Sequence, residues 1–130
     1  MTKLGLVLDC SNPDELAKFW APALGYTIVG GAGAYVMLLP VEPGPPQLLL
    51  QRVPEPKSAK NRMHLDIHTA DIEAEATHLE TLGARRVESA QRSEHGSSWV
   101  LMADPEGNEF CVLRRPVPPE PEPFNAPDLP

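Results

Sequence analysis

The order of expected strands and helices repeats once along this 130-residue chain. Alternation of apolar and polar side chains predicts the strands, and apolar residues three and four apart predict the helices. The expected strands are 4–9, 26–29, 34–39 and 47–53 in the first half, and 62–69, 85–89, 97–103 and 109–114 in the second. One helix follows the first strand of each half. The sequence therefore predicts an α+β fold of two βαβββ modules, 1–53 and 61–115.

Local signals mark where the two helices begin. Asn12 is expected to cap the first helix, and Glu15 is expected to reach back to it in a capping box. Asp71, or alternatively Thr69, is expected to cap the second helix. Pro22 lies inside the first helix, where it is expected to kink the last turn or to end the helix early.

Charge and composition exclude several classes of function. The chain carries 18 acidic and 11 basic residues, a formal net charge of −7, without a lysine and arginine cluster, which argues against nucleic acid and anionic membranes as partners. The first residues lack the apolar core of a signal peptide, so we expect a cytoplasmic protein. Its two cysteines, Cys10 and Cys111, are then expected to be reduced. Prolines recur from Pro116 onward and predict an irregular tail over 116–130.

The strand that opens the second module carries several titratable side chains on one face. His64, Asp66 and His68 alternate there with apolar residues. His64 is a candidate general base, with Glu109 as its catalytic partner, because imidazole titrates near neutral pH. The alternative is a pocket histidine that forms a hydrogen bond with Asp66 or Gln51. His68 lies about 13 Å from His64 along the strand and is expected at the surface.

Four short motifs recur in the order and spacing of a known superfamily. They are Phe19-Trp20 with Ala23-Leu24-Gly25-Tyr26, the strand-opening His64, Glu80-Thr81-Leu82-Gly83-Ala84, and Asp104-Pro105-Glu106-Gly107-Asn108-Glu109-Phe110. Together they resemble the vicinal oxygen chelate proteins, which include glyoxalase I, bleomycin-resistance proteins and extradiol dioxygenases. The resemblance implies two half-barrels of mixed sheet with the helices outside, enclosing a cup for a small molecule.

In metal-using members of that superfamily, four positions in the cup hold one divalent ion, such as zinc, nickel, iron or manganese. Carried over to this chain, these positions fall on Gly5, Gln51, His64 and Cys111. Gly5 has no side chain to offer, which leaves His64, Gln51 and Cys111 as the implied ligands. An alternative set combines His64 and Cys111 with Glu109 or Asp66, and nitrogen, sulfur and oxygen donors of this kind suit zinc.

The resemblance leaves several functions open. One is a metal-assisted lyase or isomerase that acts on a vicinal-oxygen substrate through His64 and Glu109. Another is a metal-free protein that sequesters a small molecule of the antibiotic type, and a third is a regulatory domain with a vestigial pocket. The pocket is expected to be lined by Asp66, Gln51, Trp99 and Cys111, with Trp99 either stacking on a flat ligand or packing in the core. We also expect a homodimer, because exposed sheet edges are commonly covered by pairing.

Overall fold

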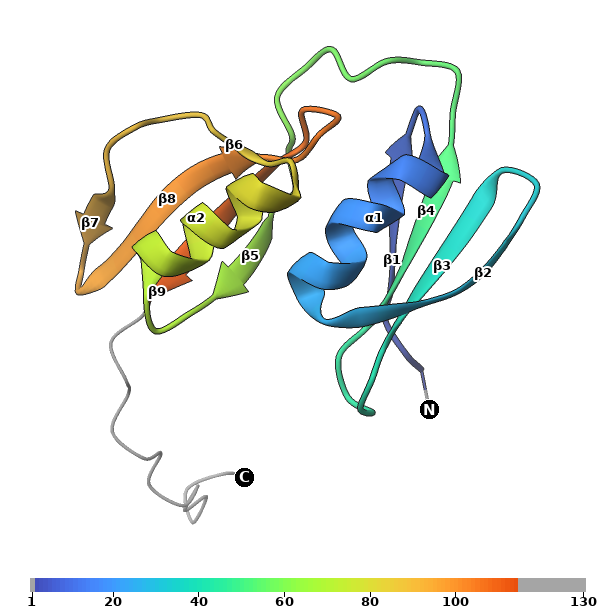
Figure 1. The fold of residues 1–130 in the computed structure, drawn as a ribbon, viewed down its shortest axis with the longest axis horizontal. Helices are drawn as coiled ribbons and strands as arrows, with labels where there is room; N and C mark the ends of the chain where they lie inside the picture. Colours follow the sequence, from blue (N-terminus) through green and yellow to red (C-terminus); the bar gives the residue numbers. More distant parts are fainter. Residues whose placement is uncertain (1, 115–130) are drawn as a thin grey trace, which may run out of the picture.

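The computed structural model describes residues 2–114 and contains the two expected modules (Figure 1). The first consists of β1 (Gly5–Cys10), α1 (Pro13–Leu24), β2 (Tyr26–Ala32), β3 (Tyr35–Pro40) and β4 (Gln47–Arg52). The second consists of β5 (Leu65–His68), α2 (Ile72–Leu82), β6 (Arg85–Arg86), β7 (Arg92–Glu94), β8 (Ser97–Ala103) and β9 (Glu109–Arg114). The predicted α+β fold is confirmed. The tail expected over 116–130 lies outside the described residues.

Each module forms its own mixed sheet. The first sheet has the strand order β1-β4-β3-β2 and the second β5-β9-β8-β6. β1 runs parallel to β4 in the first sheet, and β5 runs parallel to β9 in the second. The short strand β7 pairs with β8, although the sequence predicted only a loop there. Its three residues are too few to show an alternating pattern. A turn at His95 and Gly96, both with positive φ, joins the two strands.

The helices begin at the predicted capping residues. The Asn12 side chain accepts a hydrogen bond from the backbone of Glu15, and Asp71 caps α2 in the same way. The predicted capping box is wrong, however, because Glu15 pairs with a lysine instead of reaching back to Asn12. Glu106, from the other module, accepts the hydrogen bond that was expected for Glu15. Its carboxylate accepts hydrogen bonds from the backbone N–H groups of Ser11 and Asn12, at 2.6 and 2.9 Å.

The helices end at glycines in the left-handed conformation. Gly25 has φ 68° and Gly83 has φ 118°, a backbone conformation that side chains disfavour. Pro22 does not end α1 early, since the helix continues to Leu24. Neither helix in the described part of the chain is long and apolar enough to cross a membrane.

One core joins the two modules. Both helices cover the same side of their sheets (Figure 1), and α1 contacts α2 as well as its own sheet. Phe19 and Trp20 from α1 meet Phe110 from β9, with ring centroids 5.8 and 5.2 Å apart. All three side chains are almost fully buried, so this aromatic cluster closes the contact between the modules.

A buried carboxylate lies beside that cluster. Asp104 begins the turn between β8 and β9 and is 2% exposed. It accepts hydrogen bonds from the Trp20 indole, from the Asn108 side chain and from the backbone N–H groups of Glu106 and Asn108, each at 2.9 Å. A buried charge is tolerated only when it is satisfied in this way. The Asp104 side chain therefore shapes the turn and fixes it to α1.

Replacing Asp104 with alanine is expected to lower the free energy of unfolding by about 2–4 kcal/mol, because it leaves the Trp20 indole and the turn amides without acceptors. Urea unfolding followed by circular dichroism measures this loss. Glu42→Ala, in an exposed loop, serves as the control and should change stability little. Equal stabilities of the two variants would show that the buried carboxylate does not hold the modules together.

Candidate functional site

The side of each sheet that faces away from its helix is called here the open face. Along β1, Leu6, Leu8 and Cys10 are more buried than the residues between them and pack toward α1. Gly5, Val7 and Asp9 therefore lie on the open face. Val7 is 58% exposed. Burial alternates in the same way along β3, β4 and β5, so the less buried side chains of these strands lie on the open faces.

His64 and Glu109 lie side by side at the start of the second sheet. β5 and β9 run parallel with Leu65 opposite Phe110, which places the preceding residues, His64 and Glu109, next to each other. The His64 Nε2 atom lies 3.1 Å from the carbonyl oxygen of Asn61. Because a carbonyl only accepts, Nε2 carries the proton and Nδ1 is the basic nitrogen. This partner differs from the predicted Asp66 or Gln51.

Lys60 holds the Glu109 carboxylate in its ionised form. Its Nζ atom lies 2.8 Å from Oε2 of Glu109. This hydrogen bond lowers the pKa of Glu109, and the charges of Lys60, His64 and Lys57 act in the same direction. The backbone N–H of Glu109 also donates to the Asn61 side chain at 3.2 Å. Glu109 is therefore a fixed, charged acceptor at neutral pH.

Three further predicted pocket residues lie in the second sheet. Asp66 pairs in register with Cys111, two residues further along the strands than His64 and Glu109. Burial, followed by the charge of Asp66, raises the pKa of the Cys111 thiol, so the free side chain stays protonated at neutral pH. Trp99 pairs with Leu113 and Arg92 and is partly buried. His68 is exposed, as expected.

Gln51, the remaining predicted site residue, lies in the other module. It pairs with Asp9 on β1 and with Tyr35 on β3. Gln47, not Gln51, is the residue of β4 opposite Gly5. Gln51 is thus four residues, or about 13 Å, along the strand from the position that the glycine leaves open.

The donor groups at these positions do not fit a divalent ion. Within residues 2–114 no three side chains of histidine, cysteine, aspartate or glutamate come together as a metal-binding group. The alternative set of His64 and Cys111 with Glu109 or Asp66 is therefore not assembled. Glu109 is engaged by Lys60 in an ion pair.

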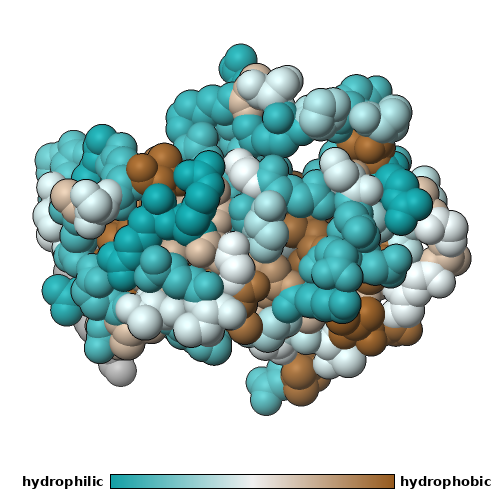
Figure 2. All heavy atoms as spheres, turned by 45° about the horizontal axis from the view of Figure 1, so that its top comes forward, coloured by the Kyte–Doolittle hydropathy of each residue, from teal (hydrophilic) through white to brown (hydrophobic). Residues whose placement is uncertain are grey.

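A pocket of about 520 Å³ opens between the two modules, where β1 lies beside β5. We call it the seam pocket. Its lining is mostly apolar and includes Val7, Leu48, Met63 and Leu65, with Trp20 as the one aromatic residue and Asn61, Asn108 and Glu109 as the polar ones. Figure 2 shows hydrophobic surface between the two halves of an otherwise largely hydrophilic face. Volume and lining are those of a small-molecule site.

The sequence predicted part of this site. Glu109, predicted as a catalytic residue, lines the pocket, and so does Trp20, which is otherwise packed in the core. Lys60 and Asn61 were not predicted as site residues, because only the parallel pairing of β5 with β9 brings them to Glu109. The homodimer stays a prediction, and the molecular mass in solution by light scattering tests it.

Comparisons with known proteins agree with this architecture. The model of a family described as a glyoxalase-like domain matches residues 5–113. A glyoxalase-related enzyme from Fulvimarina pelagi is similar in structure, with 17% identity, 92% of each chain covered and a TM-score of 0.71. A glyoxalase/bleomycin resistance protein/dioxygenase from Nocardioides has 14% identity, covers 96% of this chain and 90% of its own, and has a TM-score of 0.70. At these identities the likeness concerns the fold alone. No curated protein matches the sequence.

Replacing Lys60 with glutamine is expected to raise the pKa of Glu109 toward the ordinary range of glutamates, because the hydrogen bond from Lys60 is the largest cause of its lowering. A carbon-13 NMR titration of the carboxyl groups measures the change. Since the pKa of Glu109 is lower in the folded than in the unfolded protein, its contribution to stability is present where free glutamates are ionised and is lost as the pH falls through the lowered pKa. The stability difference between the two proteins should therefore vanish in acid.

Lys57→Gln is the matched control. Lys57 acts on Glu109 only through its charge, as the smallest of the named causes, so its loss should move the pKa of Glu109 less. If both variants shift the pKa equally, the hydrogen bond from Lys60 is not what holds Glu109 ionised.

Proposed function

Because the chain belongs to the glyoxalase-like domain family, we propose that it binds a small apolar molecule in the seam pocket. The predicted membership of the vicinal oxygen chelate superfamily is confirmed by the match over residues 5–113. Proteins of this family bind small molecules. The pocket between β1 and β5 has a volume and a lining that suit one in this chain.

The lining of the pocket carries this proposal. Side chains from both modules, Val7 and Leu48 from the first and Met63 and Leu65 from the second, face one space of about 520 Å³. Met63 and Val7 are 76% and 58% exposed, so a ligand that covers them removes apolar surface from water. A single charged side chain, Glu109, lies in the lining and would orient a bound molecule.

Trp20 offers a direct test of this proposal, because it lines the pocket while Trp99, the other tryptophan of the chain, does not. In the Trp99→Phe variant, compounds from a small-molecule library that enter the pocket are expected to shift or quench Trp20 emission saturably, and to raise the melting temperature. Met63→Asp should weaken every such compound, since it places a charge in the apolar lining. Glu94→Gln, on the exposed strand β7, should not.

A library that produces no saturable change in Trp20 emission would contradict a binding site at the seam. Metal content of the same chelator-free sample, by mass spectrometry, extends the test. Stoichiometric zinc, nickel, iron or manganese would instead support the metal-assisted lyase or isomerase.

Proton transfer is the second candidate function, favoured by the pairing of His64 with Glu109. The Nδ1 atom of His64 is a base, and the negative charge of Glu109 beside it would stabilise the imidazolium that forms when the base takes a proton. In this function His64 removes a proton from a hydroxyl-bearing carbon next to a carbonyl group and returns it to the former carbonyl carbon of the enediol. A proton passes from one enediol oxygen to the other, so the carbonyl and hydroxyl groups exchange places, which is an isomerisation.

His64→Gln separates this candidate from simple binding. If the protein is an isomerase, it is expected to exchange deuterium from solvent into dihydroxyacetone or a related hydroxyketone, followed by proton NMR, and the variant should lose at least about a hundredfold of that rate. The melting temperature should stay unchanged because His64 is exposed. His68→Gln, on the same strand, is the control. Equal exchange by the wild-type protein and by His64→Gln would exclude His64 as the base.

A further inference from the structure

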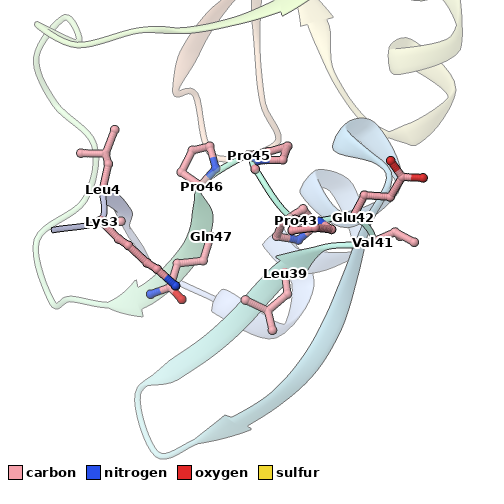
Figure 3. Close-up of a pocket in the computed structure, with 12 residues that line it drawn as sticks. Lys3, Leu4, Leu39, Val41, Glu42, Pro43, Pro45, Pro46 and Gln47 are labelled. Carbon is pink, nitrogen blue, oxygen red and sulfur yellow. The ribbon is translucent and has the colours of Figure 1, made fainter. Parts of the chain in front are cut away.

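A second cavity adjoins the seam pocket at the beginning of β1. It has a volume of about 880 Å³ and lies beside the proline-rich loop 40–46 that joins β3 to β4. Figure 3 shows Leu39 and Gln47 at the two ends of this loop, with Lys3 and Leu4 next to Gln47. We call it the proline-loop pocket. Leu4 and Gly5 line both cavities, so the two spaces are neighbours at these residues.

The backbone conformation at position 5 does not require glycine. Its φ is not positive, unlike that of Gly25 or Gly33, so a residue with a side chain can adopt the same conformation. A Cβ atom built at Gly5 would meet only the Gln47 side chain, at 3.5 and 3.8 Å, which is ordinary contact. The glycine thus affects space rather than conformation.

We propose, on the basis of the proposed function, that Gly5 is the specificity-determining residue of the site. Without a side chain there, the seam pocket continues into the proline-loop pocket, and the combined space is long and mostly apolar. It takes an elongated aliphatic molecule. A compact ligand would fill the seam pocket alone and would gain nothing from the glycine.

Glu109 determines the head group of this molecule. Its Oε2 atom is bound by Lys60, and within residues 2–114 its Oε1 atom accepts no hydrogen bond. Asn108, the polar neighbour in the lining, donates its side-chain N–H to Asp104 and is not available as a donor. The polar end of the pocket therefore presents a charged acceptor. A ligand that ends in an amine or a hydroxyl group can donate a hydrogen bond to its Oε1 atom, whereas a carboxylate has no proton to donate.

Decylamine, decanol and decanoate share one aliphatic body and differ in the head group, so they separate these statements. In the Trp99→Phe background, decylamine and decanol are expected to change Trp20 emission saturably, and decanoate to bind at least about tenfold more weakly. Glu109→Gln should weaken decylamine by about tenfold and leave decanol nearly unchanged, because the amide still accepts a hydrogen bond but no longer attracts a cation. Glu88→Gln, whose carboxylate pairs with Arg92 at the surface, is the matched control.

Gly5→Val tests the junction. The added side chain should close the path between the two cavities and weaken both decylamine and decanol by about tenfold or more, without loss of melting temperature. Thr27→Val replaces a hydroxyl with a methyl group on the open face of the same sheet, outside both pockets, and should change neither affinity.

Each result decides one part of the proposal. Decanoate binding as tightly as decylamine would overturn the assigned head group, and an unchanged affinity in Gly5→Val would overturn the role of the glycine. If library compounds shift Trp20 emission but none of the three decyl compounds does, the inference fails while the proposed function stands. If no compound does, both fail.

Discussion

The buried carboxylate of Asp104 is the interaction on which the arrangement of the two modules depends. An ionised group out of water must be surrounded by donors, and here the donors come from both modules, the Trp20 indole from one and the turn amides from the other. Glu106, two residues further on, binds the start of α1 and so fixes the same turn a second time. One five-residue turn therefore sets how the helix of the first module meets the sheet of the second.

This mode of attachment explains why a pocket exists at the seam. The modules are held together by α1 and the turn, whereas β1 and β5 belong to separate sheets among the described residues. The neighbouring edges of the two sheets stay apart, and apolar residues from each line the space between them. The rigid contact through α1 and the turn thus leaves an accessible site between the neighbouring sheet edges. Residues such as Trp20 serve both purposes because they lie at the boundary.

The sequence was informative where the deciding contacts are local. A cap such as Asn12 is recognised from the three residues that follow it, and alternating side chains place His64 and Asp66 on one face. Contacts between distant segments could not be predicted in this way. Lys60 meets Glu109, 49 residues further along the chain, only because β5 and β9 run parallel. The sequence also gives no register between β1 and β4. In the structure Gln47, and not Gln51, lies opposite Gly5.

The hydrogen bond between Trp20 and Asp104 joins residues 84 positions apart, and this separation has a consequence for synthesis on the ribosome. When the first module has been translated, the Trp20 indole and the first amides of α1 still lack their acceptors, and Phe19 lacks the ring of Phe110. These partners lie in β9 and in the turn that precedes it. The first module therefore waits with an incomplete core until the second emerges, so the nascent chain exposes apolar surface over most of its translation.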